Sequence, residues 1–188
     1  MSIATTTPNS LTAATGTWVI DAAHTNLGFS VRHAMVSKAR GNFGEFTGSF
    51  TIDGDNLVGS SAELTIQAAS IDTKNADRDA HLTSADFLDV ENFATVTFVS
   101  TAVSVDGDSV IVTGDLTIHG VTKSVDVAYE FVGISQDPWG QTKIGFEGST
   151  KISRKDFGLV YNAALETGGV LIGDEIRLSL DVEAAKQA

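Results

Sequence analysis

Apolar and polar residues alternate along most of the chain between Trp18 and Val182. Successive side chains of a β-strand point to opposite faces, so a period of two predicts strands with one buried face and one wet face. Glycine and aspartate turns interrupt the alternation at intervals. The final segment shows it most clearly: one parity carries Val170, Ile172, Ile176, Leu178, Leu180 and Val182, and the other carries Glu175, Arg177, Ser179, Asp181 and Glu183.

Residues 74–91 interrupt this pattern. They lack alternation and combine helix-forming residues with N-cap candidates, which predicts one or two short helices at about 75–81 and 84–88. Elsewhere the pattern predicts strands, several of them longer than the usual five or six residues. The predicted strands cover about 17–20, 26–35, 41–52, 59–71, 95–105, 109–118, 122–134, 143–153 and 170–183.

A chain of such strands must close on itself or pair with a second sheet. We therefore predict an all-β fold with eight or so antiparallel strands, either an up-and-down barrel or a β-sandwich. The long strands favour the barrel. A barrel of this size is just wide enough to be filled by side chains or to hold one slender ligand.

The 188 residues suit a single all-β domain. We assign residues 1–15, which are rich in Thr, Ser, Ala and Asn, to a flexible leader, and residues 16–188 to one barrel domain. The N-terminus lacks a basic start and an apolar core, so we expect no secretory signal and a cytoplasmic location. No apolar run approaches the roughly 20 residues of a transmembrane helix. A closed barrel has no open edge, so a homodimer would have to use side-chain patches.

The formal net charge is −12, from 24 acidic and 12 basic residues, which argues against nucleic acid as a partner. The absence of cysteine excludes thiolate catalysis and thiolate metal sites. The 4 histidines do not stand at metal-ligand spacings, and no nucleophile–base motif stands out. We therefore predict no metal site, no cofactor and no catalytic residue.

Two short segments hold half of the bases: Arg32, Lys38 and Arg40 in one, and Lys151, Arg154 and Lys155 in the other. They are either a solvated surface or a receptor for phosphate or another anionic head group.

Parity also divides the strand residues into inward and outward sets. His33 continues the inward row of its strand, so it is either a core histidine bonded to a neighbour or a polar anchor at a cavity. An inward apolar row packs on itself more often than it lines a void. The inward candidates are Leu27, Phe29, Val31, His33, Phe46, Phe50, Leu64, Ile66, Phe98, Leu116, Ile118, Tyr129, Phe131, Ile176 and Leu178.

Several local motifs, in order along residues 17–183, resemble the YceI-like family of bacterial lipocalin-like barrels associated with polyisoprenoid binding. The motifs are Trp18-Val-Ile-Asp21-Ala-Ala-His24, Phe29-Ser-Val-Arg-His33, Gly41-Asn-Phe43-Gly-Glu-Phe46-Thr-Gly48, Arg78-Asp79-Ala-His81-Leu82, Asp86-Phe87-Leu-Asp89, Gly114-Asp-Leu116-Thr-Ile-His119-Gly120-Val-Thr-Lys123, Ser153-Arg154-Lys155-Asp156-Phe157-Gly158 and Gly173-Asp174-Glu175.

The resemblance implies an extended eight-stranded lipocalin-like barrel whose hydrophobic tunnel holds an isoprenoid tail, and it implies no established enzymatic role. Our main hypothesis is therefore non-enzymatic binding or carriage of a polyisoprenoid lipid, an isoprenoid quinone or a prenyl phosphate. The tail would lie in the lumen, with His33, Arg32, Lys38 or Arg154 near the head group. Two alternatives stay open. One is a lipid-acting enzyme that uses His33 or His81 with a carboxylate, and the other is a filled, stress-linked structural barrel.

Overall fold

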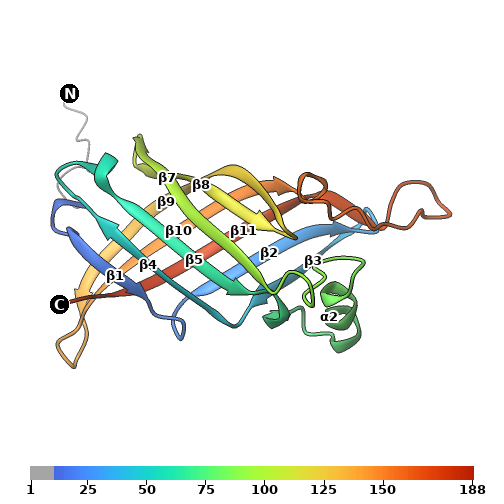
Figure 1. Ribbon diagram of the computed structural model, residues 1–188, viewed down its shortest axis with the longest axis horizontal. Coiled ribbons are helices and arrows are strands. Elements are labelled where there is room, and N and C mark those ends of the chain that lie inside the picture. The colour runs from blue at the N-terminus through green and yellow to red at the C-terminus, as the bar shows by residue number, and fades with distance from the viewer. Residues whose placement is uncertain (1–10) are drawn as a thin grey trace.

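The computed structural model describes residues 11–188, which form a long antiparallel barrel with one α-helix beside it (Figure 1). The helix is α2 (Ala76–Thr83), and three 3-10 turns are η1 (Leu57–Gly59), η2 (Ala68–Ser70) and η3 (Arg154–Phe157). The strands are β1 (Gly16–Ile20), β2 (Asn26–His33), β3 (Ser37–Phe43), β4 (Phe46–Ile52), β5 (Ser61–Gln67), β6 (Ile71–Asp72), β7 (Thr95–Asp106), β8 (Ser109–Ile118), β9 (Val121–Gln136), β10 (Thr142–Ser153) and β11 (Ile172–Lys186).

The sheet closes because β11 pairs with β10 on one edge and with both β1 and β2 on the other. β1 and β2 lie end to end along β11 and act as one long strand. β3 and β4 likewise act as one long strand, with β3 paired to β2 and β4 paired to β1. β5 and β6 form the next long strand, with β5 paired to β4 and β6 paired to β3. Counted this way, eight long strands run up and down around the barrel in chain order. The predicted eight-stranded barrel is confirmed, and the β-sandwich alternative was wrong.

The main errors of the strand prediction lie where one long strand is broken in two. The predicted strand 41–52 is β3 and β4, which begin earlier and are separated at Gly44 and Glu45. There the backbone turns to other partners: the Gly44 amide donates to the Ser70 carbonyl at 3.2 Å, and the Gln67 amide donates to the Glu45 carbonyl at 2.9 Å. The alternation continues through such a break, so the sequence pattern does not reveal it.

The predicted helix at about 75–81 is confirmed as α2, where the Asn75 side chain caps the helix by accepting from the Arg78 amide at 2.9 Å. Of the one or two predicted helices, the one at about 84–88 is not formed. The Ser84 hydroxyl donates to the His81 carbonyl at 2.6 Å, and the chain then reverses, with the Val90 amide donating to the Thr83 carbonyl at 3.1 Å. These bonds end α2 and hold the next residues as turns.

The packed part of the chain includes residues that the sequence pattern assigns to a flexible leader. Leu11 and Ala14 are buried, and the Trp18 indole nitrogen donates to the Ala14 carbonyl at 2.8 Å. The boundary at residue 16 was therefore placed too late, since the chain packs on the barrel from at least Leu11. Residues 1–10 lie outside the described part of the chain.

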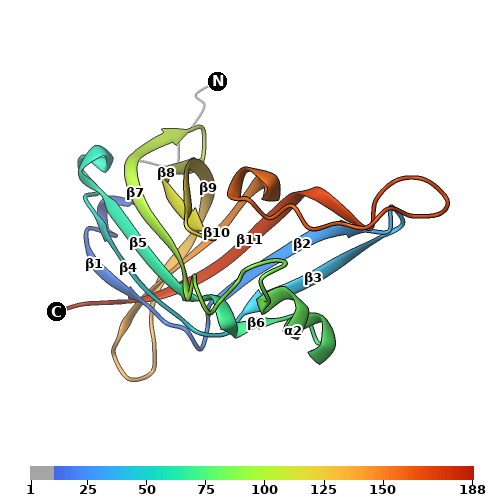
Figure 2. The same ribbon diagram turned by 45° about the vertical axis from the view of Figure 1, so that its right-hand side comes forward.

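The two ends of the barrel differ in what fills them. We call the end near β1 and the β9–β10 loop the Trp18 end, and the end with α2, η3, the β2–β3 turn and residues 159–171 the helix end (Figure 2). A buried cluster that includes Trp18, Ile52, Ile144 and Ala184 fills the Trp18 end. A second cluster of buried hydrophobic residues packs against α2 and η3 at the helix end. Over residues 11–188, no helix has the length and apolar character needed to cross a bilayer.

Candidate ligand-binding cavity

A cavity of about 690 Å³ lies inside the barrel. That volume is within the usual range for small-molecule sites, and its walls are almost entirely apolar. The wall residues come from all eight long strands and from α2, η3 and the residues that follow them. From the Trp18 end to the helix end the wall includes Leu11, Ile52, Val110, Val112, Phe50, Phe98, Tyr129, Phe146, Leu64, Leu178, Leu180, Phe29, Val31, Leu116, Ile118, Ile176, Leu82, Phe87 and Tyr161.

All of the residues predicted to face inward line this cavity except Phe46 and Phe131. Phe46 is buried in the cluster near the helix end, and Phe131 packs on Phe146 with ring centroids 5.6 Å apart. These two rings belong to the packed wall rather than to its cavity surface. The barrel is therefore not filled by its own side chains, which contradicts the filled-barrel alternative.

Glycines explain why the large aromatic side chains leave the lumen open. Gly114 lies beside Phe98 on the neighbouring strand, and a Cβ atom built on it would be 2.4 Å from the Phe98 Cζ. Gly148 pairs with Tyr129, whose Cε1 would be 2.4 Å from such a Cβ. The missing side chains let each ring lie flat over the adjacent strand instead of projecting across the bore.

Tyr129 places a hydroxyl group in the middle of this apolar wall. Its burial raises the pKa of the phenol to about 12. No hydrogen bond from this hydroxyl to another protein group is found within residues 11–188, so it is a neutral donor at the cavity surface.

Polar and charged side chains gather where the cavity reaches the helix end. The His81 Nε2 lies 2.9 Å from an Asp86 carboxylate oxygen, and its ring packs edge-on against Tyr161 and Phe87 at 4.9 and 5.0 Å. Arg78 donates from Nε to the Thr73 hydroxyl and from Nη2 to the Thr73 carbonyl, both at 2.8 Å. The sequence had not paired His81 with Asp86, because their contact depends on the turn that follows α2.

His33 faces the cavity at this end, and Arg32 borders it from the outer face of β2. His33 is half-buried at the cavity wall, and no hydrogen bond to its ring is found within the described residues. Arg32 is exposed and forms no ion pair in the described part of the chain. His33 is therefore free to meet a polar group at the cavity entrance, and Arg32 lies outside it.

Arg154 and Lys38, the other two head-group candidates, are placed differently. Arg154 is only 2% exposed, and burial lowers the pKa of its guanidinium. It donates to the carbonyls of Leu159, Tyr161 and Gly173 at 2.6, 2.8 and 2.9 Å, so its donors hold the connection from η3 to β11. Lys38 lies on the outer face of β3 and is not part of the cavity wall.

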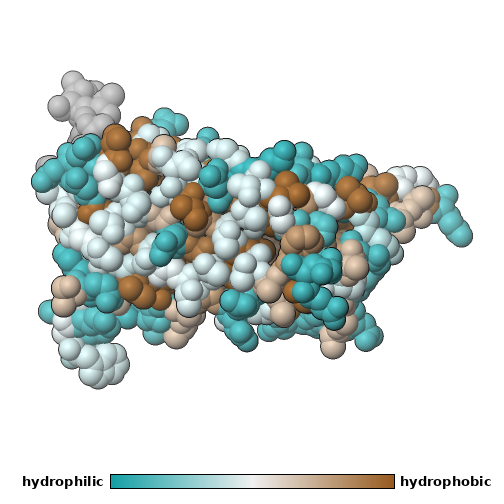
Figure 3. All heavy atoms as spheres, in the orientation of Figure 1, coloured by the Kyte–Doolittle hydropathy of each residue, from teal (hydrophilic) through white to brown (hydrophobic). Residues whose placement is uncertain are grey.

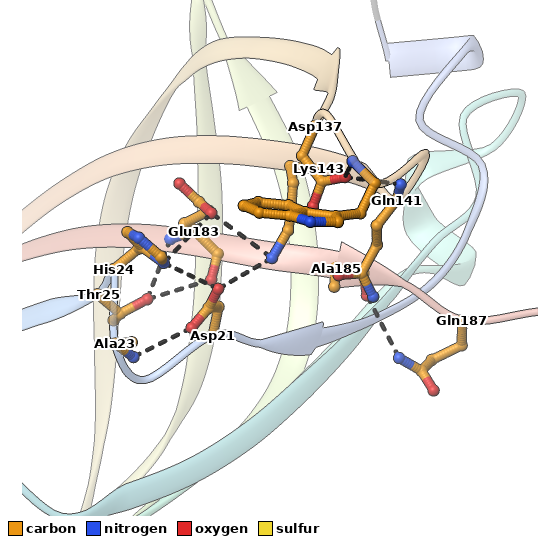
Figure 4. A network of polar contacts seen from close by, with 11 residues as sticks. Asp21, Ala23, His24, Thr25, Asp137, Gln141, Lys143, Glu183, Ala185 and Gln187 are labelled. Carbon is orange, nitrogen blue, oxygen red and sulfur yellow. Dashed lines mark hydrogen bonds and ion pairs between the residues drawn. The ribbon is translucent and has the colours of Figure 1, made fainter.

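Far from these groups, a polar network ties the β1–β2 junction to β10 and β11 at the Trp18 end (Figure 4). Asp21, His24 and Glu183 are close enough to share one metal ion. However, the Lys143 ammonium lies 2.9 Å from Asp21 and 3.7 Å from Glu183, between the two carboxylates. Lys143 and His24 together lower the pKa of Asp21 to about 2. We interpret the network as a structural ion cluster, because a protein cation already occupies the position between the acids.

The sequence analysis missed the part of the wall that comes from outside the strands. Asp77 and Leu82 of α2, and Tyr161 and Leu171 of the η3–β11 connection, line the cavity without any alternation to mark them. Among these segments, only His81 had been considered, as a member of an acid–base pair.

Comparison with known proteins agrees with this architecture. The family model described as the YceI-like domain matches residues 18–184. A UPF0312 protein of Pseudomonas aeruginosa is 41% identical over 164 residues, which cover 87% of this chain and 83% of that protein.

Solved structures show the same fold. Burkholderia cenocepacia BcnA aligns with a TM-score of 0.74 at 24% identity, covering 87% of this chain and 98% of that one. A polyisoprenoid binding domain from Saccharophagus degradans, implicated in plant cell wall breakdown, aligns with a TM-score of 0.68 at 16% identity, covering 90% and 98%. Since the family model spans nearly all of the described residues and the Pseudomonas relative is similar over most of its length, the chain belongs to the YceI-like family.

Proposed function

We propose that this protein binds or carries a polyisoprenoid lipid, an isoprenoid quinone or a prenyl phosphate, with the tail in the barrel lumen. The observation that carries the proposal is the continuous apolar cavity of about 690 Å³. Each methylene buried there contributes roughly 0.8 kcal/mol, so a long apolar chain gains enough to offset its own ordering. The solved domain from Saccharophagus degradans, described as polyisoprenoid-binding, has the same fold and supports the same class of ligand.

The head group would lie at the helix end. His33, Arg78 and His81 reach the cavity there, and Arg32 borders it from the outer face of β2, whereas a packed cluster lies at the Trp18 end. Arginine suits a phosphate, and neutral histidine suits a quinone carbonyl. We favour non-enzymatic binding, because the His81–Asp86 pair has no nucleophile or oxyanion donor arranged around it in residues 11–188.

Delipidated protein, incubated with a prenyl quinone and a prenyl phosphate and analysed by lipid extraction and mass spectrometry, tests the proposal. We expect retention of at least one of them at about one molecule per chain. Leu178→Trp would fill part of the lumen and lower retention at least tenfold. Ser179→Trp, the neighbouring outward position on β11, is the matched control and should retain lipid normally.

Circular dichroism shows whether both tryptophan variants keep the barrel. Failure of the delipidated wild-type protein to take up either lipid would refute the proposal. Equal retention by the two variants would show that any bound lipid lies outside the lumen. Turnover of the lipid that disappears in His81→Gln would instead favour the enzyme alternative.

A further inference from the structure

The β2–β3 hairpin is the most cationic surface of an otherwise acidic chain. No acidic residue lies between Asp21 and Glu45, whereas this stretch holds Arg32, Lys38 and Arg40. All three are exposed, and within residues 11–188 none of them forms an ion pair. We call these three residues the cationic ribbon.

The strand register places the cationic ribbon on one face. Arg32 pairs directly with Lys38, and Arg40 lies two residues farther along the same strand, so all three point away from the lumen. Arg177 of β11 extends this surface, because it pairs with Ser30, which in turn pairs with Arg40. Like charges opposite each other destabilise an isolated ribbon, so this arrangement favours an anionic partner.

Exposed apolar residues form the tip of the same hairpin. Met35 is 62% exposed and Val36 is 83% exposed, in the turn between β2 and β3. Ala34 and Met35 have φ values of 48° and 65°, a backbone conformation in which polar residues or glycine are usual. Val170, 40% exposed, comes from the connection that the hairpin touches: the Ala34 amide donates to the Leu171 carbonyl at 2.7 Å. We call Met35, Val36 and Val170 the apolar tip.

We propose that the apolar tip and the cationic ribbon dock the protein on an anionic lipid bilayer, with the helix end of the cavity toward the membrane. Shallow insertion of apolar side chains together with basic residues beside them is a usual way for a peripheral protein to bind such a surface. Figure 3 shows hydrophobic residues interspersed with hydrophilic ones toward this end of the molecule.

The position of the cavity supports this docking site. His33, which ends β2, and Leu171 and Ile172, which adjoin the hairpin, all line the cavity. A lipid moving between bilayer and lumen at this end would cross little water. The inference rests on the proposed function, because docking would serve to pass lipid between the bilayer and the lumen. Bilayer binding itself is measured without any lipid in the lumen.

The opposite end of the barrel also has exposed apolar side chains, Val58 and Val105 among them, and the most exposed is Trp139 at 88%. Asp137 lies in the same loop and accepts from the Trp139 amide at 2.9 Å, and the same end holds the network of Asp21, Glu183 and Lys143, in which two acids flank one base (Figure 4). An anionic surface would repel this end and attract the cationic ribbon, so the charge distribution orients the molecule. Trp139 therefore serves as the internal control.

Sedimentation with vesicles tests the inference. We expect the full-length protein to bind vesicles of phosphatidylglycerol and phosphatidylcholine, and to bind pure phosphatidylcholine vesicles at least tenfold more weakly. Lys38→Gln/Arg40→Gln should lower binding to the anionic vesicles by roughly tenfold or more. Met35→Asn/Val36→Ser should lower it severalfold, with asparagine chosen because it tolerates a positive φ. Trp139→Phe is the control and should bind like the wild type.

A fluorescence measurement checks the orientation. In a Trp139→Phe background, Met35→Trp adds a reporter at the apolar tip, and Trp18 remains buried. Anionic vesicles should shift the emission of this reporter to shorter wavelength, whereas Trp139 in the unmodified protein should stay accessible to a water-soluble quencher.

Absence of wild-type binding to anionic vesicles would overturn the inference. Undiminished binding by all of the hairpin variants would also overturn it. So would protection of Trp139 from the quencher by vesicles, because it would show binding through the Trp18 end. These results are independent of the proposed function, because lipid retention is scored in vesicle-free protein. If retention is normal and vesicle binding is absent, only the docking inference fails. If vesicle binding is normal and no prenyl lipid is ever retained, only the proposed function fails.

Discussion

The two ends of this barrel are built from the same alternating strands, but one end is packed with side chains and the other encloses a cavity. At the Trp18 end, Trp18 is fully buried and stacks on Phe50, and Leu11 packs beside them. At the helix end, the inward row Phe29, Val31 and His33 faces a cavity. The difference teaches that alternation fixes which way a side chain points, while the space in front of it depends on what the neighbouring strands and connections contribute.

The largest expected effect tests this comparison through stability. Trp18→Ala should destabilise the lipid-free protein by about 3–5 kcal/mol, because it empties a packed site and removes the bond to Ala14. Phe29→Ala should cost about 1–2 kcal/mol, because the ring already faces open space. Urea denaturation of both variants measures the difference. Equal losses would mean that the helix end is packed as tightly as the Trp18 end.

A middle-sized effect concerns how the helix end is held together. Arg154→Met should destabilise the protein by about 3 kcal/mol, because it leaves the carbonyls of Leu159, Tyr161 and Gly173 without their donor. Limited proteolysis should then cut the connection between η3 and β11 faster than in the wild type.

Lys155→Met is the matched control for this prediction. Lys155 is exposed and forms an ion pair with Asp174 at 3.1 Å. Such surface pairs contribute about 0–1 kcal/mol, so the control should lose little stability. Similar losses in the two variants would show that Arg154 acts mainly as a surface charge and not as the buried clamp of the helix end.

The sequence predicts the regular part of this fold well. Most of the residues that parity placed inward do line the cavity, because a strand keeps its inward set between bulges; the bulge of β7 after Ser100 changes the parity, so Phe98 and Val103 both face the lumen. Phe46 and Phe131 were exceptions, because parity separates inward from outward but does not separate a packed ring from one that borders a void. Gly114 and Gly148 decide that question for Phe98 and Tyr129, and they do so from a neighbouring strand.

What the sequence could not supply are contacts that depend on the closed barrel. His81 meets Asp86 only after the chain reverses behind α2, and Asp21 meets Lys143 and Glu183 only when β11 closes against β1. Leu11 looked like part of a leader because a single apolar residue among small polar ones has no period. Each of these is a long-range consequence of closure, and a local pattern carries no information about it.

The smallest expected effect lies at the Trp18 end, in the ion network of the β1–β2 junction. The folded pKa of Asp21, about 2, is below its ordinary value of 3.8, so its contribution to stability is present above about pH 4 and is lost as the pH falls toward 2. Asp21→Asn should therefore cost about 1 kcal/mol at pH 6, a value reduced for solvent screening because the side chain is 21% exposed.

Urea curves at pH 6 and near pH 2 measure this effect, and the wild type and Asp21→Asn should converge at the lower pH. His24 has the opposite dependence, because Asp21 raises the pKa of its ring above 6.5. Its contribution is complete below pH 6.5 and disappears as the pH rises through the folded value. The network should thus be strongest between about pH 4 and 6.5. A constant difference between wild type and Asp21→Asn across that whole range and down to pH 2 would mean that the ionisation of Asp21 does not stabilise the junction.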